Sequence, residues 1–421
     1  MHLDKILAAQ KRGEARGMFS VCSAHPYGIK QTLKVCETYK IPPLIEATCN
    51  QVNQFGGYTG LTPADFVCYV RGIAKENNFP FENIILGGDH LGPSVWQDEP
   101  ANVAMRKAEA LIRDYVEAGF VKIHLDCSMR LADDPEGALD VGVSAKRAAR
   151  LARIAEGVGH ENLRYVIGTE VPIAGGAMEH EEGVSLTKAE DARQTIEITR
   201  QAFYSAGLQS AWERVIAVVV QPGVEFGDDF VLSYQPDAAK ELSLFIETQP
   251  LVYEAHSTDY QTRQALGDLV QDHFAILKVG PALTFAFREA VFALAMMENE
   301  LLPSHERSNI ISLLDVVMVE QPEHWVKYYH GDEREKAFKR KYSLSDRIRY
   351  YWTDPIIKQA FKKMMMQLNQ NPLPATLLRQ YAPDVYTMAT QTARLTPENI
   401  LLAKIQNVVD DYVQACNPQL C

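Results

Sequence analysis

Residues 120–126 read FVKIHLD and decide the fold class of this chain. The positions 121, 123 and 125 are apolar, whereas Lys122, His124 and Asp126 are ionisable. Side chains of a β-strand alternate between its two faces, so the segment predicts a strand with one apolar and one ionisable face. In a closed barrel, the apolar face would meet surrounding helices and the ionisable face would point inward.

Other segments have the same strand character, and helical segments separate them. Thr62 followed by Pro63 is a typical helix start, and the alanine-rich stretch 101–118 ends at Gly119. About eight strand–helix units in about 280 residues match the size of a (β/α)₈ TIM barrel, which we predict, with an open doubly wound sheet as the alternative. The predicted strands lie within residues 17–26, 43–51, 84–92, 120–129, 164–172, 215–223, 251–260 and 275–283.

Ionisable residues gather inside this predicted barrel and at the ends of its strands. The alternation of side chains places Glu46, Glu170, Glu254, His256 and Lys278 on inward faces, as it does the three ionisable residues of the quoted segment. The C-terminal ends of barrel strands form the mouth at which barrel enzymes carry out chemistry. Because an unpaired buried charge is costly, we expect these groups to be paired, bound to a metal ion, or open to the mouth.

The strand pattern stops well before the C-terminus, and helical patterns replace it. We therefore predict a barrel over residues 1–300 and an appended helical lobe over residues 301–421. Residues 336–352 of this lobe mix basic and aromatic side chains. We interpret this segment as a helix that docks on the barrel, and disfavour nucleic-acid binding. As a further alternative, Arg347 or Arg349 reaches over the mouth and holds a substrate phosphate.

The composition is that of a soluble globular protein, with 47% hydrophobic and 23% charged residues among 421. A net charge of -12 argues against nucleic acid or an anionic membrane as a partner. No apolar segment approaches the ~20 residues that span a bilayer, and the N-terminus has no signal-peptide core, so we expect a cytoplasmic protein. The cysteines form no Cys-x-x-Cys pair and are expected to be reduced.

Long strings of sequence carry a family resemblance. They are SAHP at 23–26, EATCNQVNQFGGYTG at 46–60, GGDHLGP at 87–93, VQPGVEF at 220–226, EAHSTDYQT at 254–262, LKVGPAL at 277–283 and YSLSDRIRYYW at 342–352. These strings resemble the Z subunit of bacterial D-tagatose-1,6-bisphosphate aldolase over nearly the whole chain. Members of that family are described as non-catalytic partners of a class II aldolase Y subunit, required for its full activity and stability in galactitol or N-acetylgalactosamine breakdown. The resemblance therefore implies an accessory subunit in an oligomer with a catalytic Y subunit.

The resemblance also implies roles for residues at the barrel mouth. Class II aldolases use a divalent cation, usually zinc, to polarise the ketose carbonyl, and an aspartate before a metal-binding histidine moves the proton of the C4 hydroxyl. By similarity, Asp89 is the acid/base residue, and His90 and His256 are metal ligands. The aldolases carry a further histidine after strand five, where this sequence has Glu170. Glu170 is the expected substitute as third ligand and joins Asp89 among the catalytic candidates, with Zn²⁺ or another divalent cation as cofactor.

Further side chains at the mouth are candidates for substrate binding. We expect His25, Glu46, Asp126 and Lys278 to contact a phosphorylated or free ketohexose. Lys278 as a Schiff-base lysine is a less favoured alternative. His124 lies deeper on its strand and is predicted to be a hydrogen-bonded core histidine.

Two departures from the aldolases weaken the expected phosphate site. Asp259 adds negative charge after strand seven, and Pro281 removes an N–H donor after strand eight. A free hexulose would tolerate this change, so a metal-dependent D-fructose/D-tagatose 4-epimerase, working by retro-aldol cleavage and re-addition, is the alternative function. A kinase is disfavoured because the sequence has no Gly-x-x-x-x-Gly-Lys-Ser/Thr loop, and no nucleotide cofactor is expected.

Overall fold

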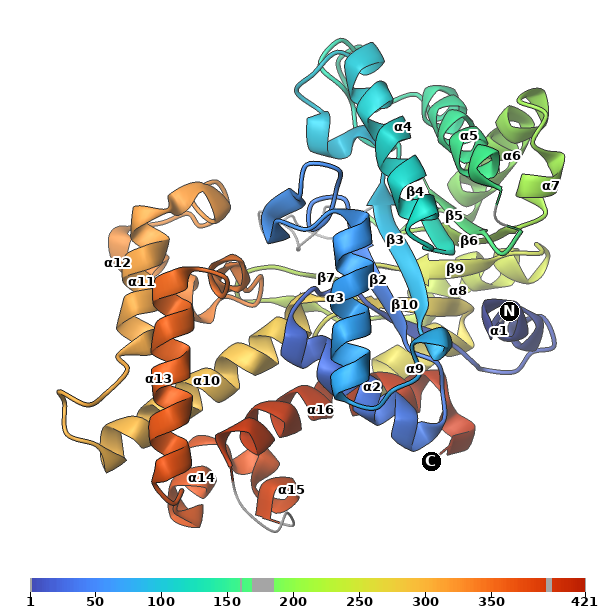
Figure 1. Cartoon of the computed structure of the whole chain (residues 1–421). Coiled ribbons are helices and arrows are strands. Elements are labelled where there is room, and N and C mark those ends of the chain that lie inside the picture. Colours follow the sequence, from blue (N-terminus) through green and yellow to red (C-terminus); the bar gives the residue numbers. More distant parts are fainter. Residues whose placement is uncertain (1, 160, 169–184, 391–395, 421) are drawn as a thin grey trace.

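The computed structural model describes residues 2–159, 161–168, 185–390 and 396–420. Its centre is a closed barrel of parallel strands surrounded by helices (Figure 1). Neighbouring strands pair in chain order, and β10 pairs with β1 to close the ring. This confirms the predicted (β/α)₈ barrel over the open sheet. The barrel strands are β1 (Met18–Val21), β2 (Leu44–Thr48), β3 (Ile85–Leu91), β4 (Lys122–Leu125), β5 (Arg164–Gly168), β6 (Val215–Val219), β9 (Val252–Ala255) and β10 (Phe274–Val279).

Helices separate the strands and continue after the last one. The helix start predicted at Thr62 is present: the Thr62 side chain accepts a hydrogen bond from the Asp65 N–H, and Pro63 occupies the first turn. No helix within the described part of the chain is long and apolar enough to cross a membrane. The helices are α1 (His2–Gln10), α2 (Pro26–Tyr39), α3 (Pro63–Glu76), α4 (Ala101–Glu117), α5 (Val141–Val158), α6 (Ala189–Ser205), α7 (Gln209–Trp212), α8 (Pro236–Glu247), α9 (Arg263–Gln271), α10 (Pro281–Leu301), α11 (Ile310–Glu320), α12 (Glu333–Tyr342), α13 (Pro355–Gln370), α14 (Ala375–Tyr381), α15 (Tyr386–Thr390) and α16 (Pro397–Cys416).

The alternation of side chains along the strands separates an outer apolar layer from the barrel interior. Ile123 and Leu125 of β4 belong to the large cluster that the strands form with the surrounding helices. A second, smaller cluster fills the barrel where the strands begin, and Leu3 and Ile6 of α1 close it from outside. The inward residues further along the strands are charged, among them the fully buried Lys122. The interior therefore has an apolar floor below a polar layer.

The C-terminal helices differ in how closely they approach the barrel. Helix α16 lies against α2, α9, α10 and β1, and the Gly17 N–H donates a hydrogen bond to the Cys416 carbonyl over 2.8 Å. Helix α16 therefore packs beside the barrel, against helix α2 from the start of the barrel sequence and helices α9 and α10 from its end (Figure 1). Helices α11 to α13 form a separate group farther from the strands (Figure 1). The division of the chain at residue 300 remains a prediction.

Candidate active site

A cavity of about 790 Å³ lies at the C-terminal ends of the barrel strands. Its barrel side includes Asp89, His256 and Lys278 from three different strands or the loops that follow them. Its opposite side includes Arg347 and Arg349 of the short 3₁₀ helix η5 (Arg347–Tyr351) in the C-terminal helical region. The cavity is therefore shared between the barrel and the C-terminal region, as the alternative interpretation of these arginines requires.

The end of β3 has an unusual backbone that directs its side chains. His90 has a positive φ of 48°, a conformation uncommon for a residue with a Cβ. Two residues later, a Cβ built on Gly92 would lie 1.6 Å from the carbonyl oxygen of Asp126, so only glycine permits this approach of β3 to the end of β4. As a result, His90 Nδ1 lies 2.8 Å from Asp126 Oδ2.

Asp126 orients His90 from behind the cavity wall. Burial opposes ionisation of Asp126, but its hydrogen bond with His90, the charge of that imidazole and a hydrogen bond from Ser128 outweigh it and lower the pKa of Asp126 below its ordinary value. The Ser128 hydroxyl donates to the other carboxylate oxygen over 2.6 Å. Both carboxylate oxygens of Asp126 therefore already have hydrogen-bond partners within the protein.

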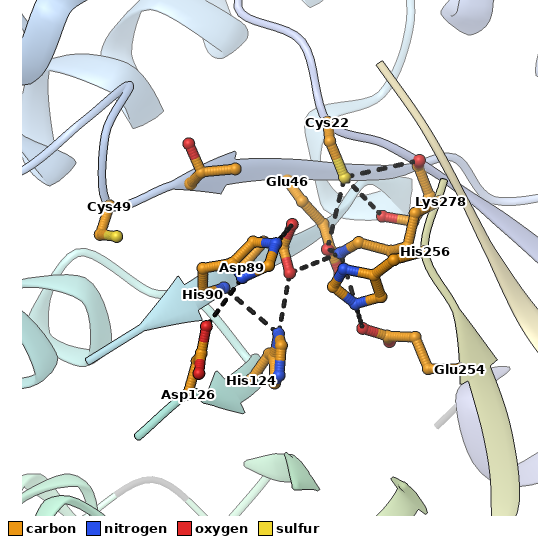
Figure 2. Close-up of polar contacts among 12 residues, drawn as sticks. Cys22, Glu46, Cys49, Asp89, His90, His124, Asp126, Glu254, His256 and Lys278 are labelled. Atoms are coloured by element: carbon orange, nitrogen blue, oxygen red, sulfur yellow. Dashed lines mark hydrogen bonds and ion pairs between the residues drawn. The ribbon is translucent and has the colours of Figure 1, made fainter. Parts of the chain in front are cut away.

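The predicted inward charges form one buried network of carboxylates and ammonium groups. Figure 2 shows the part of it around Asp89 and Lys278. Lys122 Nζ lies 2.7 Å from Glu46 Oε1 and 2.6 Å from Glu254 Oε2. Lys278 Nζ contacts Glu46, lies 2.9 Å from Asp89 Oδ1 and is 3.7 Å from Glu254 Oε1. Burial opposes the charge on Lys278, but Asp89 and the neighbouring acidic groups raise its pKa well above the ordinary value. The inward charges are thus paired with one another.

Three imidazoles surround the carboxylate of Asp89 and its neighbour Glu254 (Figure 2). His124 Nδ1 lies 2.9 Å from Asp89 Oδ1, and His256 Nε2 lies 3.1 Å from Glu254 Oε1. The rings of His90 and His256 meet edge to face with centroids 4.8 Å apart. Burial lowers the pKa of His256 to about 4, so this imidazole is neutral at pH 7 and keeps a lone pair for a ligand.

Four of these groups could hold a metal ion. Donor atoms of Asp89, His124, Glu254 and His256 all lie within 4.8 Å of one another, and all four residues are buried. Two imidazoles with carboxylates are a donor set that Zn²⁺ accepts. Of the predicted metal ligands, His256 belongs to this cluster, whereas His90 is turned toward Asp126. The third predicted ligand, Glu170, lies outside the described residues.

The structure places the predicted substrate-binding residues at different depths. His25 and Lys278 line the cavity, whereas Glu46 and Asp126 lie behind its wall and contact Lys278 and His90. Burial lowers the pKa of His25 to about 3. His124 makes the hydrogen bond predicted for a core histidine and also belongs to the donor cluster. In the sequence, His124 lies on the ionisable face of segment 120–126, and this position was the signal for a role as a metal ligand.

Cys22 is a site residue that the sequence analysis did not single out. It follows β1 directly, lines the cavity, and its Sγ lies 3.8 Å from Glu46 Oε2. Burial raises the pKa of this thiol well above its ordinary value, so Cys22 is a protonated thiol at pH 7. Its place within the predicted strand segment 17–26 was the available signal.

Comparison with known proteins places the chain in a family. The family model described as D-tagatose-1,6-bisphosphate aldolase subunit GatZ/KbaZ-like matches residues 3–417. The chain belongs to this family. Similar proteins from Salmonella typhimurium strain LT2 and Klebsiella pneumoniae subsp. pneumoniae are named D-tagatose-1,6-bisphosphate aldolase subunit GatZ. The first is 51% identical over 99% of this chain and 100% of its own length, and the second is 52% identical over 98% and 99%.

A solved structure has the same architecture. A crystal structure from Sinorhizobium meliloti 1021, described as a probable tagatose 6 phosphate kinase, is 45% identical and has a TM-score of 0.89. The match covers 95% of this chain and 100% of that one. The family resemblance carried by the quoted strings is thus confirmed over both the barrel and the C-terminal helices.

Proposed function

We propose that this chain is the accessory subunit of a class II D-tagatose-1,6-bisphosphate aldolase and sustains the activity and stability of a separate catalytic Y subunit in the cytoplasm. The observation that carries the proposal is the match to an aldolase-subunit family over residues 3–417. The relatives named as this subunit align with this chain over 99–100% of their own length.

The geometry around Asp89 supports a non-catalytic role. Burial disfavours the ionised carboxylate, but His90, Lys278 and His124 outweigh this effect and hold the pKa of Asp89 well below its ordinary value. A general base works best when its pKa lies near the working pH. A carboxylate this acidic, already paired with an ammonium group 2.9 Å away, is a poor proton acceptor.

The donor atoms present suit a divalent cation, but the ammonium group of Lys278 competes with it for the same carboxylates. Asp89, His124, Glu254 and His256 would hold it, and when bound it would polarise a carbonyl oxygen as a Lewis acid. Lys278 Nζ is itself within 3.7 Å of both carboxylates of this set and already supplies positive charge there. An ammonium group in this place stabilises these carboxylates without a metal ion.

Two enzymatic functions are alternatives to the accessory role, and neither is favoured. A D-fructose/D-tagatose 4-epimerase would use the donor cluster as a metal site, and it is not favoured because the curated relatives carry the name of an aldolase subunit. Phosphoryl transfer from a nucleotide, which the name of the Sinorhizobium protein would suggest, is not proposed because the sequence has no phosphate-binding Gly-x-x-x-x-Gly-Lys-Ser/Thr loop.

The test is to assay a purified class II tagatose-bisphosphate aldolase Y subunit with and without this chain. Triose phosphate release from D-tagatose 1,6-bisphosphate and the half-life of the activity at 37 °C are followed as this chain is added. We expect both to rise and to saturate at a fixed ratio of the two chains. The chain alone should release no triose phosphate and should not convert D-fructose to D-tagatose, with or without added Zn²⁺ or Mn²⁺.

The Asp89→Asn variant distinguishes an accessory subunit from an enzyme that carries out catalysis itself. An accessory subunit should keep its stimulation of the Y subunit, whereas a general acid/base residue contributes roughly 10²–10⁴-fold to rate. Asp237→Asn, at an exposed carboxylate on α8, is the matched control. Catalysis by this chain alone that disappears in Asp89→Asn and persists in Asp237→Asn would overturn the proposal.

A further inference from the structure

Exposed apolar side chains gather in the helical group α11–α13. Among the described residues, twelve large hydrophobic side chains are exposed, and seven of them lie within residues 316–366. The seven are Val316, Val319, Val326, Phe338, Tyr342, Ile356 and Met366. Scattered apolar residues are ordinary on a protein surface, whereas a gathering of them marks an interaction site.

Helices α11 and α13 present part of this gathering as one continuous face. The two helices pack against each other, side by side in Figure 1. At one end, Gln321 Nε2 donates to Asp354 Oδ2 over 3.2 Å, and at the other, Lys363 Nζ donates to the Arg307 carbonyl over 2.6 Å. The helices therefore run antiparallel, with the end of α11 beside the start of α13. Their outer side, here called the α11/α13 face, consists of Val316, Val319, Ile356, Lys362 and Met366.

The apolar residues of α13 on this face do not contribute to the core. The side of the helix that packs inward is formed by other residues, among them the buried Ile357, Ala360 and Met364. Ile356 and Met366 are instead 51% and 52% exposed. They offer apolar area that is removed from water only when another surface covers it.

The same region is basic, although the protein as a whole is acidic. Residues 310–370 contain 11 basic and 8 acidic residues, whereas the rest of the chain contains 31 and 46. Helix α13 contributes three lysines and no acidic residue. The nearby Glu320 and Asp354 both stand at the end where α13 begins, and Asp354 is engaged in capping that helix. A surface with carboxylates around an apolar centre would therefore complement the α11/α13 face.

Other occupants fit this charge pattern less well. Nucleic acid and anionic membranes are disfavoured because the whole chain has a net charge of -12. A second copy related by a two-fold axis would place the same face on both sides of the contact. Each copy would then oppose three lysines of α13 mainly to Glu320, which leaves positive charges without partners. An acidic surface of a different protein is the better match.

We propose that the α11/α13 face is the surface through which this chain binds a Y-type catalytic subunit, by way of an acidic and apolar surface of that subunit. The identity of the partner rests on the proposed function, whereas the location rests on the apolar and basic residues of the face. The lysines attract the partner and the apolar residues hold it. Because Lys358 and Phe361 of α13 line the cavity, the bound subunit stands beside the cavity rim.

Binding of the purified full-length chain to a fluorescently labelled class II tagatose-bisphosphate aldolase Y subunit tests this surface. Fluorescence anisotropy gives the Kd, and stopped-flow mixing gives the association rate. We expect Ile356→Asp and Met366→Asp each to raise the Kd tenfold or more, as for apolar residues at the centre of an interface. Lys362→Glu should slow association, and more so at low salt than at high salt, because salt screens the attraction between exposed charges.

Matched variants on α8 are the controls. Leu244→Asp replaces an apolar residue that is 53% exposed, and Lys240→Glu reverses an exposed lysine. Both should leave the Kd and the association rate unchanged. The thermal unfolding midpoint of every variant should equal that of the native chain, since all five side chains are exposed.

The outcomes separate this proposal from the proposed function. A native chain that stimulates the Y subunit, with unchanged Kd in both Ile356→Asp and Met366→Asp, would overturn the location and leave the accessory role intact. A native chain that neither binds nor stimulates the Y subunit would overturn both. Sedimentation of the chain alone identifies the remaining occupant. Self-association that Ile356→Asp abolishes, with binding to the Y subunit unchanged, would assign the face to a second copy and overturn the proposal.

Discussion

Lys122 shows how single residues determine the barrel interior. Its side chain is fully buried, and its ammonium lies within 2.7 Å of carboxylate oxygens of Glu46 and Glu254. Both of these glutamates also lie near Lys278, so the four groups share their charges. Burial opposes the charge on Lys122, but Glu254 and Glu46 outweigh it and raise the pKa of the lysine. The pairing makes a charged layer tolerable inside the protein.

We predict that Lys122→Met strongly destabilises the protein. The substitution leaves two buried carboxylates with one ammonium, and removing one partner of a buried ion pair typically costs about 3–5 kcal/mol. The free energy of unfolding, measured by urea denaturation at pH 7, should fall by that amount. Lys336→Met, which breaks a surface pair of 3.2 Å with Glu333, should change it by less than about 1 kcal/mol. Similar effects of the two substitutions would contradict this account of the buried network.

At the scale of the elements, the end of β3 depends on how closely it approaches the end of β4. Gly92 has an extended backbone with φ of -177°, so conformational freedom is not what requires glycine there. The requirement is steric, since a Cβ would lie 1.6 Å from the Asp126 carbonyl oxygen. The same approach sets the contact between His90 and Asp126.

Gly92→Ala should therefore separate β3 from β4 and destabilise the fold. Overpacking of this kind typically costs about 1–3 kcal/mol, and a backbone obstacle places Gly92→Ala at or above the upper end. The midpoint of thermal unfolding, followed by circular dichroism, measures the effect. Gly72→Ala in α3 is the matched control, because no atom lies within 4 Å of its built Cβ and alanine favours helix by about 0.5–1 kcal/mol. A midpoint for Gly92→Ala equal to that of the native chain would show that the strands can shift freely.

At the scale of the whole molecule, the last helix takes part in the barrel's outer layer. Helix α16 packs against α2, α9 and β1, which belong to the two ends of the ring. It buries a row of apolar residues there: Ile400, Leu401, Ile405, Val409 and Val413. Because α16 follows α11 to α15 in the chain, the outer layer of the barrel is complete only once this last helix has packed (Figure 1).

We predict that a chain lacking residues 397–421 does not form a stable barrel. Each fully buried aliphatic side chain contributes about 1.5–3 kcal/mol, so loss of α16 removes as much as the whole stability of a typical domain. Limited proteolysis and urea unfolding should show rapid cleavage and no cooperative transition. A chain lacking only residues 418–421, beyond α16, should behave like the full-length protein. Cooperative unfolding of the chain that lacks residues 397–421, with an unchanged midpoint, would show that residues 1–396 fold without α16.

The sequence alone determined the strands and their faces. The alternation in residues 120–126 predicted which side chains of β4 point inward, and the same rule placed Glu46, Glu254 and Lys278 inside. This succeeds because the direction of a side chain along a strand depends only on the local backbone. The family could likewise be identified from short strings, since each one is a local pattern.

Only the tertiary structure decided which of these groups meet. Lys278 contacts Glu46, which is far away in the sequence, because the barrel closes by pairing β10 with β1. The packing of the C-terminal helices places Arg347 in the same cavity as the ends of the barrel strands, a relation that neither spacing nor composition contains. Such contacts depend on the register of all the barrel strands and on the path of the C-terminal helices. Side-chain direction is a property of neighbouring residues, whereas partnership inside a closed barrel is a property of the whole chain.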